Sequence, residues 1–295
     1  MKTLKTIMIT TLLLSAMTGC TKKAEPEPST LKCKSVGYTY DLASLTYELA
    51  WADEFDSDTI NKDNWFFETG GSGWGNNELQ YYTDGANASV KNGMLDIEAR
   101  KESFNNLNYT SARMVSRGKQ DFLYGKIDVY AQMPKTKGTW AAIWMMPQTS
   151  AYGGWPSSGE IDILETVGYA PDMIYGTIHT AVFNHKKGSQ KGFSAVLDQP
   201  EAFHLYTIEW LPDQIRYYVD GIFKFRFAPG IFLDCPTSSQ WPFDRTFYFI
   251  FNIAVGGDWG GAQGVDETGW PQHMLIDYIR VYQAKEMPDI LKNKK

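Results

Sequence analysis

The stretch Ile215-Arg216-Tyr217-Tyr218-Val219-Asp220-Gly221-Ile222-Phe223-Lys224-Phe225-Arg226-Phe227 decides the fold class of this chain. In its first half Ile215, Tyr217 and Val219 alternate with Arg216, Tyr218 and Asp220, and a period of two residues is that of a β-strand. Asp-Gly is a dipeptide typical of two-residue hairpin turns, and a second strand pattern follows it. The stretch therefore predicts two antiparallel strands joined by a tight turn.

The same period of two residues recurs along the chain. It marks segments 94–99, 126–133, 204–210 and 274–282, whereas segment 246–254 is apolar at nearly every position, as expected of a strand buried between two layers. Turn signals recur at short intervals, and no convincing amphipathic helix interrupts them. We therefore predict an all-β sandwich of two antiparallel sheets, without repeats and without a second domain.

The composition narrows the class of ligand. The chain has 295 residues, a formal net charge of −6, 43% hydrophobic and 15% aromatic residues, which supports one large domain with a generous core. No basic stripe is present, so nucleic acid is not an expected partner. Many of the 10 Trp and 17 Tyr residues lie beside Gly in apparent loops, where flat rings can stack on sugars or pack in the core.

The N-terminus has the features of an export signal. Lys2 and Lys5 precede an apolar run, and a small-residue region leads to Cys20, so residues 1–19 are predicted to be a signal peptide. Thr-Gly-Cys at this point resembles a bacterial lipobox, and acylation of Cys20 would anchor the protein to a membrane of the cell envelope, at the outer membrane or cell surface. The alternative is ordinary secretion with Cys20 unmodified. The apolar run is too short for a transmembrane helix.

The remaining boundaries follow from composition. Residues 20–42 are predicted to be a linker rich in Glu and Pro, residues 43–285 the folded domain, and residues 286–295 a polar tail. In an exported protein Cys33 and Cys235 could form a disulfide, with two free buried thiols as the alternative. A monomer is the default expectation.

Glu160-Ile161-Asp162-Ile163-Leu164-Glu165 carries the chemistry. Acidic residues are rarely placed in an apolar strand, and repulsion in a buried site would separate their pKa values. Because side chains alternate along a strand, Glu160 and Asp162 share a face while Glu165 should point away. One β-bulge between Asp162 and Glu165 would return Glu165 to the first face.

Three carboxylates on one face match glycoside hydrolysis, in which one carboxylate attacks the anomeric carbon and another protonates the leaving oxygen. The residues alone do not say which Glu attacks. Metal binding is the rival for an acidic cluster. The sequence places no His, Cys or Asn close by and contains no calcium loop, so we did not expect a metal ion here.

The whole domain resembles glycoside hydrolase family 16. Ser158-Gly159 followed by the acidic stretch is similar to the active-site signature of that family in its bulged E-x-D-x-x-E form. Further stretches in the expected order resemble other parts of the family: Trp51–Asp56, Gly75–Tyr82, Trp140–Met145, Trp155-Pro156, Gly176–His179, Asn252–Gly257 and Asp277–Tyr282. Segment 75–82 is similar to the one typical of the family's β-1,3-glucanases.

The resemblance implies a β-jelly-roll with a concave glycan-binding cleft and a retaining, double-displacement mechanism without a catalytic cofactor. By position Glu160 would be the nucleophile, Glu165 the acid/base and Asp162 the assisting carboxylate. Substrate contacts would come from further polar and aromatic residues: Trp144, Trp155, His179, Asn77, Arg113 and Asn252, with Trp140 and Trp259 as outer-subsite platforms. Alternatively the Trp and His side chains are structural, and Arg113 pairs with a carboxylate.

The resemblance also implies a structural calcium ion on the convex side, held by the backbone carbonyls of Glu54 and Gly93 and by the Asp277 carboxylate, although Asp277 could instead serve only a turn. The leading hypothesis is an envelope-anchored endo-β-1,3-glucanase that cleaves laminarin-like β-glucan. The alternatives are a β-1,3-1,4-glucanase, a galactanase similar to agarases or porphyranases, and a glycan-binding lipoprotein without activity.

Overall fold

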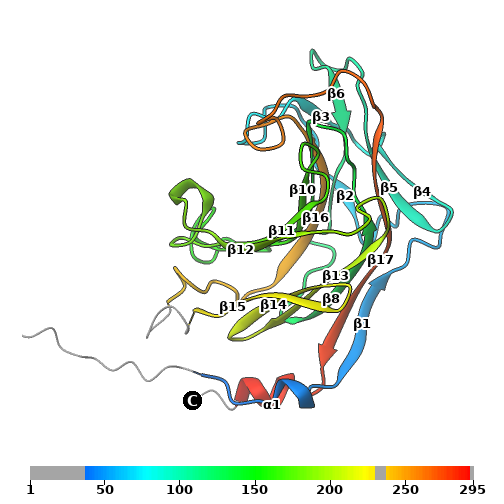
Figure 1. The fold of residues 1–295 in the computed structure, drawn as a ribbon. Helices are drawn as coiled ribbons and strands as arrows, with labels where there is room; N and C mark the ends of the chain where they lie inside the picture. Colours follow the sequence, from blue (N-terminus) through cyan, green and yellow to red (C-terminus); the bar gives the residue numbers. More distant parts are fainter. Residues whose placement is uncertain (1–36, 230–236, 293–295) are drawn as a thin grey trace, which may run out of the picture. The chain divides into compact units, whose positions relative to one another are not determined.

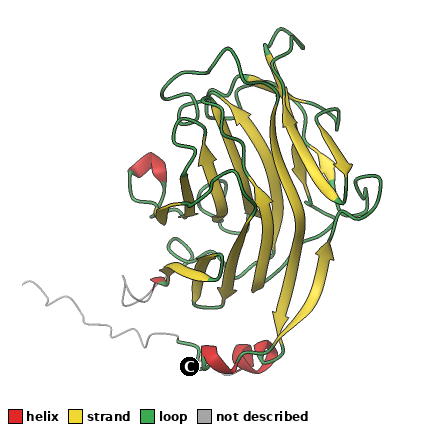
Figure 2. Cartoon of the chain, turned by 45° about the vertical axis from the view of Figure 1, so that its right-hand side comes forward, coloured by secondary structure: helices red, strands yellow, loops and turns green. Residues whose placement is uncertain are grey.

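The computed structural model describes residues 37–229 and 237–292 (Figure 1). Cys20, Cys33 and Cys235 lie outside the described residues, so the predicted signal peptide, lipid anchor and disulfide stay predictions. The described residues belong to one compact unit, whose regular elements are almost all strands (Figure 2). None of the helices in these ranges is long and apolar enough to cross a bilayer.

Two large antiparallel sheets form the domain. Sheet A has eight strands: β15 (Ile222–Phe227), β14 (Gln214–Val219), β13 (His204–Leu211), β8 (Gly125–Gln132), β17 (Gln272–Ala284), β5 (Met94–Ala99) and β4 (Ala88–Lys91) in spatial order, with β1 (Tyr47–Asp53) also paired to β17. Sheet B has seven: β12 (Lys191–Val196), β11 (Met173–His179), β10 (Glu160–Val167), β9 (Thr139–Pro147), β16 (Phe247–Val255), β7 (Arg113–Val115) and β2 (Phe66–Phe67).

Smaller elements complete the described chain. Strands β3 (Gln80–Tyr82) and β6 (Tyr109–Ser111) form a parallel pair. Short helices are η1 (Leu42–Ser44), η2 (His185–Lys187) and α1 (Met287–Lys292). The all-β sandwich predicted from the alternating pattern is confirmed, and both sheets curve in the same sense, so the outer face of sheet B is concave (Figures 1 and 2).

The hairpin predicted for residues 215–227 forms. Strands β14 and β15 pair antiparallel with Ile215 opposite Phe227. Asp220 and Gly221 both have positive φ angles, 51° and 74°, as the two central residues of a tight hairpin turn require. Ile215, Tyr217 and Val219 are buried, so the apolar face of β14 packs into the sandwich.

The core lies between the two sheets. Alternate residues of the long strands fill it, and the large fully buried side chains are mostly aromatic, among them Trp210, Phe247, Phe249 and Phe251. Every residue of β16 is buried, which confirms the prediction of a central strand for segment 246–254. This core fixes the curvature of sheet B and therefore the positions of the side chains on its concave face.

The ends of the described chain differ from the predicted boundaries. Residues 287–292 form helix α1 where we expected a polar tail, and Met287 and Ile290 on this helix are buried. Before the predicted start at residue 43, Tyr40 is hydrogen-bonded to Asp213 and accepts a hydrogen bond from Gln214. One apolar face in a short helix, and one Tyr in a polar segment, give little periodic signal, so composition alone placed both segments outside the domain.

Candidate active site

Strand β10 contains the bulge that the acidic stretch predicts. Against β11, Asp162 lies opposite Thr177 and Glu165 opposite Tyr175, so three steps along β10 match two along β11. The pairing with β9 also shifts between Asp162 and Leu164. One extra residue is therefore accommodated there, and Glu165 returns to the face of Glu160 and Asp162. Ile163 and Leu164 are both buried, at 3% and 1% exposure, so the bulge is anchored in the core.

The register places the three acids in three successive rows that cross the concave face of sheet B. One row runs Arg113, Asn252, Ala142, Glu165 and Tyr175 over strands β7, β16, β9, β10 and β11. Residues directly opposite one another across adjacent strands are neighbours on one face. Asn252 and Glu165 are thus separated by the single small side chain of Ala142.

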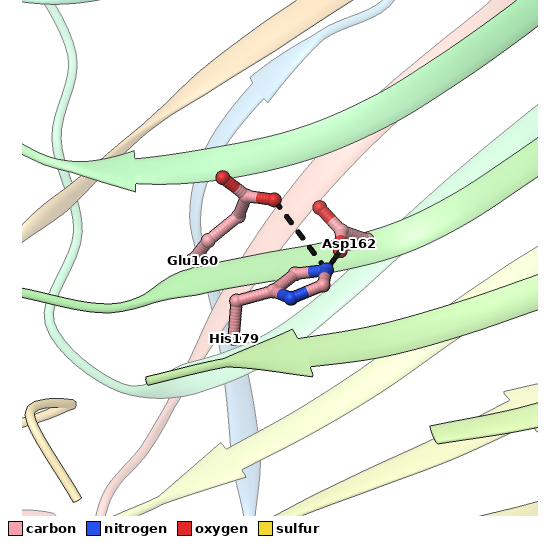
Figure 3. A group of neighbouring side chains, drawn as sticks. All are labelled: Glu160, Asp162 and His179. Atoms are coloured by element: carbon pink, nitrogen blue, oxygen red, sulfur yellow. Dashed lines mark ion pairs between the residues drawn. The ribbon is translucent and has the colours of Figure 1, made fainter. Parts of the chain in front are cut away.

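The neighbouring row holds Trp144 beside Asp162, and beyond it His179 lies opposite Glu160. In Figure 3 the His179 ring points between the two carboxylates. Its Nε2 atom is 3.2 Å from Asp162 Oδ2 and 3.7 Å from Glu160 Oε1. The three side chains are only 7%, 4% and 14% exposed for His179, Asp162 and Glu160. The site is therefore a compact acidic cluster with one imidazole, and its side chains are largely buried from solvent.

Burial dominates the electrostatics of this cluster. It raises the pKa of Glu160 well above its ordinary value, and the negative charge of Asp162 raises it further. Burial, followed by the charge of Glu165, also raises the pKa of Asp162, and burial raises the pKa of Glu165. Three carboxyl groups so close together in a dry site do not all ionise, because desolvation and mutual repulsion both favour the neutral acid. The cluster can thus hold protons at a pH where free carboxyls are ionised.

Two tryptophans donate to the two glutamates. Trp155 Nε1 donates to Glu160 Oε2 at 2.7 Å, and Trp140 Nε1 donates to Glu165 Oε1 at 3.1 Å. By resemblance to the family, Trp140 is expected at an outer subsite. Its hydrogen bond places the indole N–H at Glu165 instead, which the position of Trp140 two residues before Ala142 on β9 did not reveal. Trp259 packs edge-on against Trp140, with ring centroids 5.4 Å apart.

Other expected contacts line the face next to the acids. Trp144 Nε1 donates to Asn252 Oδ1 at 2.7 Å, and the Arg113 guanidinium lies over the Trp144 ring, 4.8 Å from its centroid. Arg113 also donates to Glu68 Oε2 at 2.7 Å, the structural pairing left open as its alternative. The row thus begins with a cation held by stacking and by a carboxylate.

The segment around Asn77 packs against the segment that leads to Trp259. Leu79 donates its backbone N–H to Val255 O, and Asn77 Nδ2 donates to Asp258 Oδ1 at 2.7 Å. Close packing explains the glycines here: a Cβ atom on Gly260 would lie 2.7 Å from Trp140 Cβ. Asn77 is exposed and is held by Asp258, so it lies at the edge of the site and not among the acids.

The strand pairing brings together residues that could hold a metal ion. Glu160, Asp162 and His179 bring ligand atoms within 4.8 Å of one another. The expectation that no His lies close to the acids is wrong, because β11 supplies His179 from 17 positions along the chain after Asp162. A ligating His usually donates its other ring nitrogen to an acceptor. His179 Nδ1 has no hydrogen-bond partner among the described residues, which does not favour a metal at this cluster.

The expected calcium ligands form a sparse set. Both carboxylate oxygens of Glu54 accept from Arg280, at 2.7 and 2.8 Å, so Glu54 would offer only its backbone carbonyl. Gly93 lies in the β4–β5 turn, and Asp277 lies at an irregularity of β17. Calcium takes about 6–8 oxygen ligands. One carboxylate and two carbonyls fit calcium only if water or other groups complete the shell.

The sequence alone does not indicate some of the residues that lie at the site. His185, on η2, packs at a tilt against Trp155 with ring centroids 5.1 Å apart, and the Lys186 ammonium lies 4.9 Å from the centroid of the same Trp155 ring. Burial lowers the pKa of His185, and the nearby His179 and Lys186 lower it further. No strand pattern or motif marks this loop. Only its concentration of His and Lys could have pointed to it.

Comparison with known proteins matches this geometry to one family. The glycosyl hydrolases family 16 profile matches residues 74–280. A beta-glucanase from Rhodothermus marinus is 44% identical over 97% of this chain and 98% of its own, and a glucan endo-1,3-beta-glucosidase from Cryptopygus antarcticus is 38% identical over 79% and 90%. The solved laminarinase from Rhodothermus marinus superposes with a TM-score of 0.79 at 46% identity, covering 82% of this chain and 99% of that one. With its bulged acidic strand on a concave sheet, this chain belongs to glycosyl hydrolase family 16.

Proposed function

We propose that this chain hydrolyses β-1,3-glucan of the laminarin type, within the polymer and with retention at the anomeric carbon. The observation that carries this proposal is the bulge in β10, because it turns Glu165 to the face of Glu160. The names of the relatives support the glucan as substrate, since they are a beta-glucanase, an endo-1,3-beta-glucosidase and a laminarinase. Family 16 hydrolysis needs no cofactor.

In the proposed reaction Glu160 attacks the anomeric carbon while Glu165 gives its proton to the glycosidic oxygen. The bond between anomeric carbon and that oxygen breaks, and a glycosyl ester of Glu160 forms. Glu165, now ionised, takes a proton from water, whose oxygen attacks the same carbon and releases Glu160. Two inversions return the original configuration, so the product is the β-anomer.

The surroundings of each acid support this division of roles. Glu160 must be ionised to attack, and the Trp155 N–H and the nearby His179 both lower its pKa against the larger effect of burial. Asp162, whose pKa burial raises, can keep the proton that the cluster holds and donate it to Glu160. Glu165 must begin protonated, and burial raises its pKa.

The substrate would lie across the three rows of the concave face that hold the acids. The surface over Ala142, between Asn252 and Glu165, is the proposed seat of one glucosyl unit. Trp144 and Trp155 would flank the cleaved linkage, one on each side of the acids, and Trp259 would extend the aromatic surface beyond Trp140. Asn252 would supply fixed hydrogen bonds to hydroxyls.

Two further features stay proposals. Cys20 would carry the lipid that holds the enzyme at the cell envelope, and Glu54, Gly93 and Asp277 would contribute to a structural calcium site. Palmitate labelling of the expressed protein, lost in Cys20→Ala, tests the anchor. A calcium-dependent rise in melting temperature, lost in Asp277→Ala, tests the ion.

One experiment tests the function and the roles together. The soluble domain is incubated with laminarin, lichenan and agarose, and the products are sized and examined by proton NMR. We expect an oligosaccharide ladder from laminarin with the β-anomer first; cleavage of agarose alone, or the α-anomer first, would contradict the proposal. With an activated β-glucoside and azide, Glu160→Ala should give the α-azide by a single inversion, whereas Glu165→Ala should give the β-azide by two.

A further inference from the structure

Glu78 is a buried carboxylate that the proposed reaction does not use. It is 8% exposed and accepts three hydrogen bonds. Asn76 Nδ2 donates to Oε1 at 3.0 Å, while Gln80 Nε2 and the Tyr82 hydroxyl donate to Oε2 at 2.7 and 3.2 Å. Hydrogen bonds to a charged acceptor are stronger than those between neutral groups. Glu78 is therefore a fixed anchor for the side chains that point at it.

One of these donors links the anchor to the concave face. The Tyr82 hydroxyl accepts from Asn252 Nδ2 at 3.0 Å, and Asn252 Oδ1 accepts from Trp144 Nε1 at 2.7 Å. Every bond in the chain runs in the same direction, from the indole through the amide and the phenol to the carboxylate. Burial raises the pKa of Tyr82, and the charge of Glu78 raises it further, so the phenol stays neutral and able to donate.

This direction determines which way the Asn252 amide faces. If the amide turned over, its NH2 would meet the Trp144 N–H and its oxygen would meet the phenol, which would then have to donate to it and leave Glu78. The anchored chain holds Oδ1 toward Trp144 and Nδ2 toward Tyr82. An amide nitrogen has two hydrogens, so one remains for a ligand.

Asn252 lies where that hydrogen matters. It is two strands from Glu165 in the same row, a span of about 10 Å, with the small Ala142 between them. A glucosyl unit seated over Ala142 would meet the Asn252 amide on one side and the catalytic acid on the other. The chain of hydrogen bonds therefore ends at the place where the proposed function seats the sugar.

We propose that Glu78 is a positioning residue for substrate binding, which through Tyr82 fixes the Asn252 amide and the Trp144 ring against the glucosyl unit beside the cleavage point. This inference rests on the proposed function and extends it to a residue that touches no substrate. It predicts a loss of uniform binding, which raises KM and leaves kcat nearly unchanged.

Tyr82→Phe tests the link because it removes only the hydroxyl and keeps the ring packed on Trp74. Asn76→Ala is the matched control: it removes a donor from Glu78 that has no connection to Asn252. With laminari-oligosaccharides we expect Tyr82→Phe to raise KM about fivefold, the typical effect of one lost hydrogen bond, with kcat within about twofold. Asn76→Ala should match the wild type.

Glu78→Gln separates positioning from general destabilisation. An amide at 78 would present hydrogens to donors, so it should raise KM as Tyr82→Phe does. If both act through one chain, the double variant should be no worse than the worse single variant, because coupled residues are not additive. Oligosaccharide affinity measured by calorimetry in a Glu160→Ala background should fall by the same factor as KM rises.

The outcomes are distinguishable. Unchanged KM in Tyr82→Phe, an equal effect of Asn76→Ala, or additive effects in the double variant would overturn the inference. Failure of the wild type to cleave laminarin would overturn the proposed function instead, and the positioning role would then be judged by calorimetry with the glycan that the wild type does bind.

Discussion

Replacing Trp155 by Phe should move the acidic limb of the pH profile to higher pH. The indole N–H of Trp155 donates to Glu160 Oε2 at 2.7 Å and stabilises the ionised form of this carboxylate. Phe keeps an aromatic ring in the same place but cannot donate. Losing the bond disfavours the ionised form, so the pKa of Glu160 rises and the nucleophile becomes active only at higher pH.

The size of the shift follows from the bond. A hydrogen bond to a charged group contributes about 1.5–3 kcal/mol, and one pKa unit corresponds to about 1.4 kcal/mol. The neutral acid also accepts a weaker bond from the indole, so only part of this free energy appears in the pKa of Glu160. We therefore expect the acidic limb to move up by about one unit.

The assay is kcat/KM against pH with a soluble laminari-oligosaccharide, because this parameter reports the free enzyme. Trp144→Phe is the control: it also loses an indole N–H, but that N–H donates to Asn252 and not to an acid. Its KM should rise while its acidic limb stays in place. An acidic limb of Trp155→Phe that coincides with the wild type, or moves to lower pH, would refute this account of the nucleophile.

Three further predictions concern stability and binding. Because burial raises the pKa of Glu160, the folded state keeps a proton on this carboxyl above its ordinary pKa, and the free energy of unfolding falls as the pH rises from the ordinary pKa to the raised one. Glu160→Gln should therefore raise the melting temperature at neutral pH by about 2–4 °C. A gain that persists near pH 4 would contradict this. Gly260→Ala should destabilise by about 1–3 kcal/mol in denaturant titration and lower kcat by displacing Trp140, whereas Gly154→Ala, with open space at its Cβ, should do neither. Arg113→Lys should raise KM about threefold because a lysine cannot lie flat between two indoles, and an unchanged KM would mean that Arg113 serves only its carboxylate partner.

The sequence determined most of the fold because its strands follow a strict period of two. The β14–β15 hairpin, the buried β16 and the bulge in β10 could all be predicted, since each leaves a local mark: a turn dipeptide, an apolar run, or acids out of phase with the alternation. Helix α1 left no such mark. Two buried side chains in six residues are too few for a helical period.

The site residues likewise divide into those that the sequence could predict and those that it could not. The acids of one strand could be found from their spacing. Contacts between strands depend on the register of the pairing, which the sequence does not specify. His179 reaches Asp162 because β11 pairs with β10 at one particular offset, and Trp140 on β9 reaches Glu165 diagonally on the adjacent β10. Glu78 lay inside a quoted motif, yet only the packing of that motif on β16 reveals its link to Asn252.

The doubled core contact at Ile163 and Leu164 has an evolutionary corollary. A chain that lost one of these two residues would regain simple alternation, and its acids at every second position would again share a face without any irregularity. Insertion and deletion of a single codon therefore interconvert two solutions to the same arrangement of acids, and neither requires a change in the acids themselves. In the form with the extra residue, the spacing of the reacting carboxyl groups depends on how Ile163 and Leu164 pack in the core. A substitution that changes this packing would therefore change kcat.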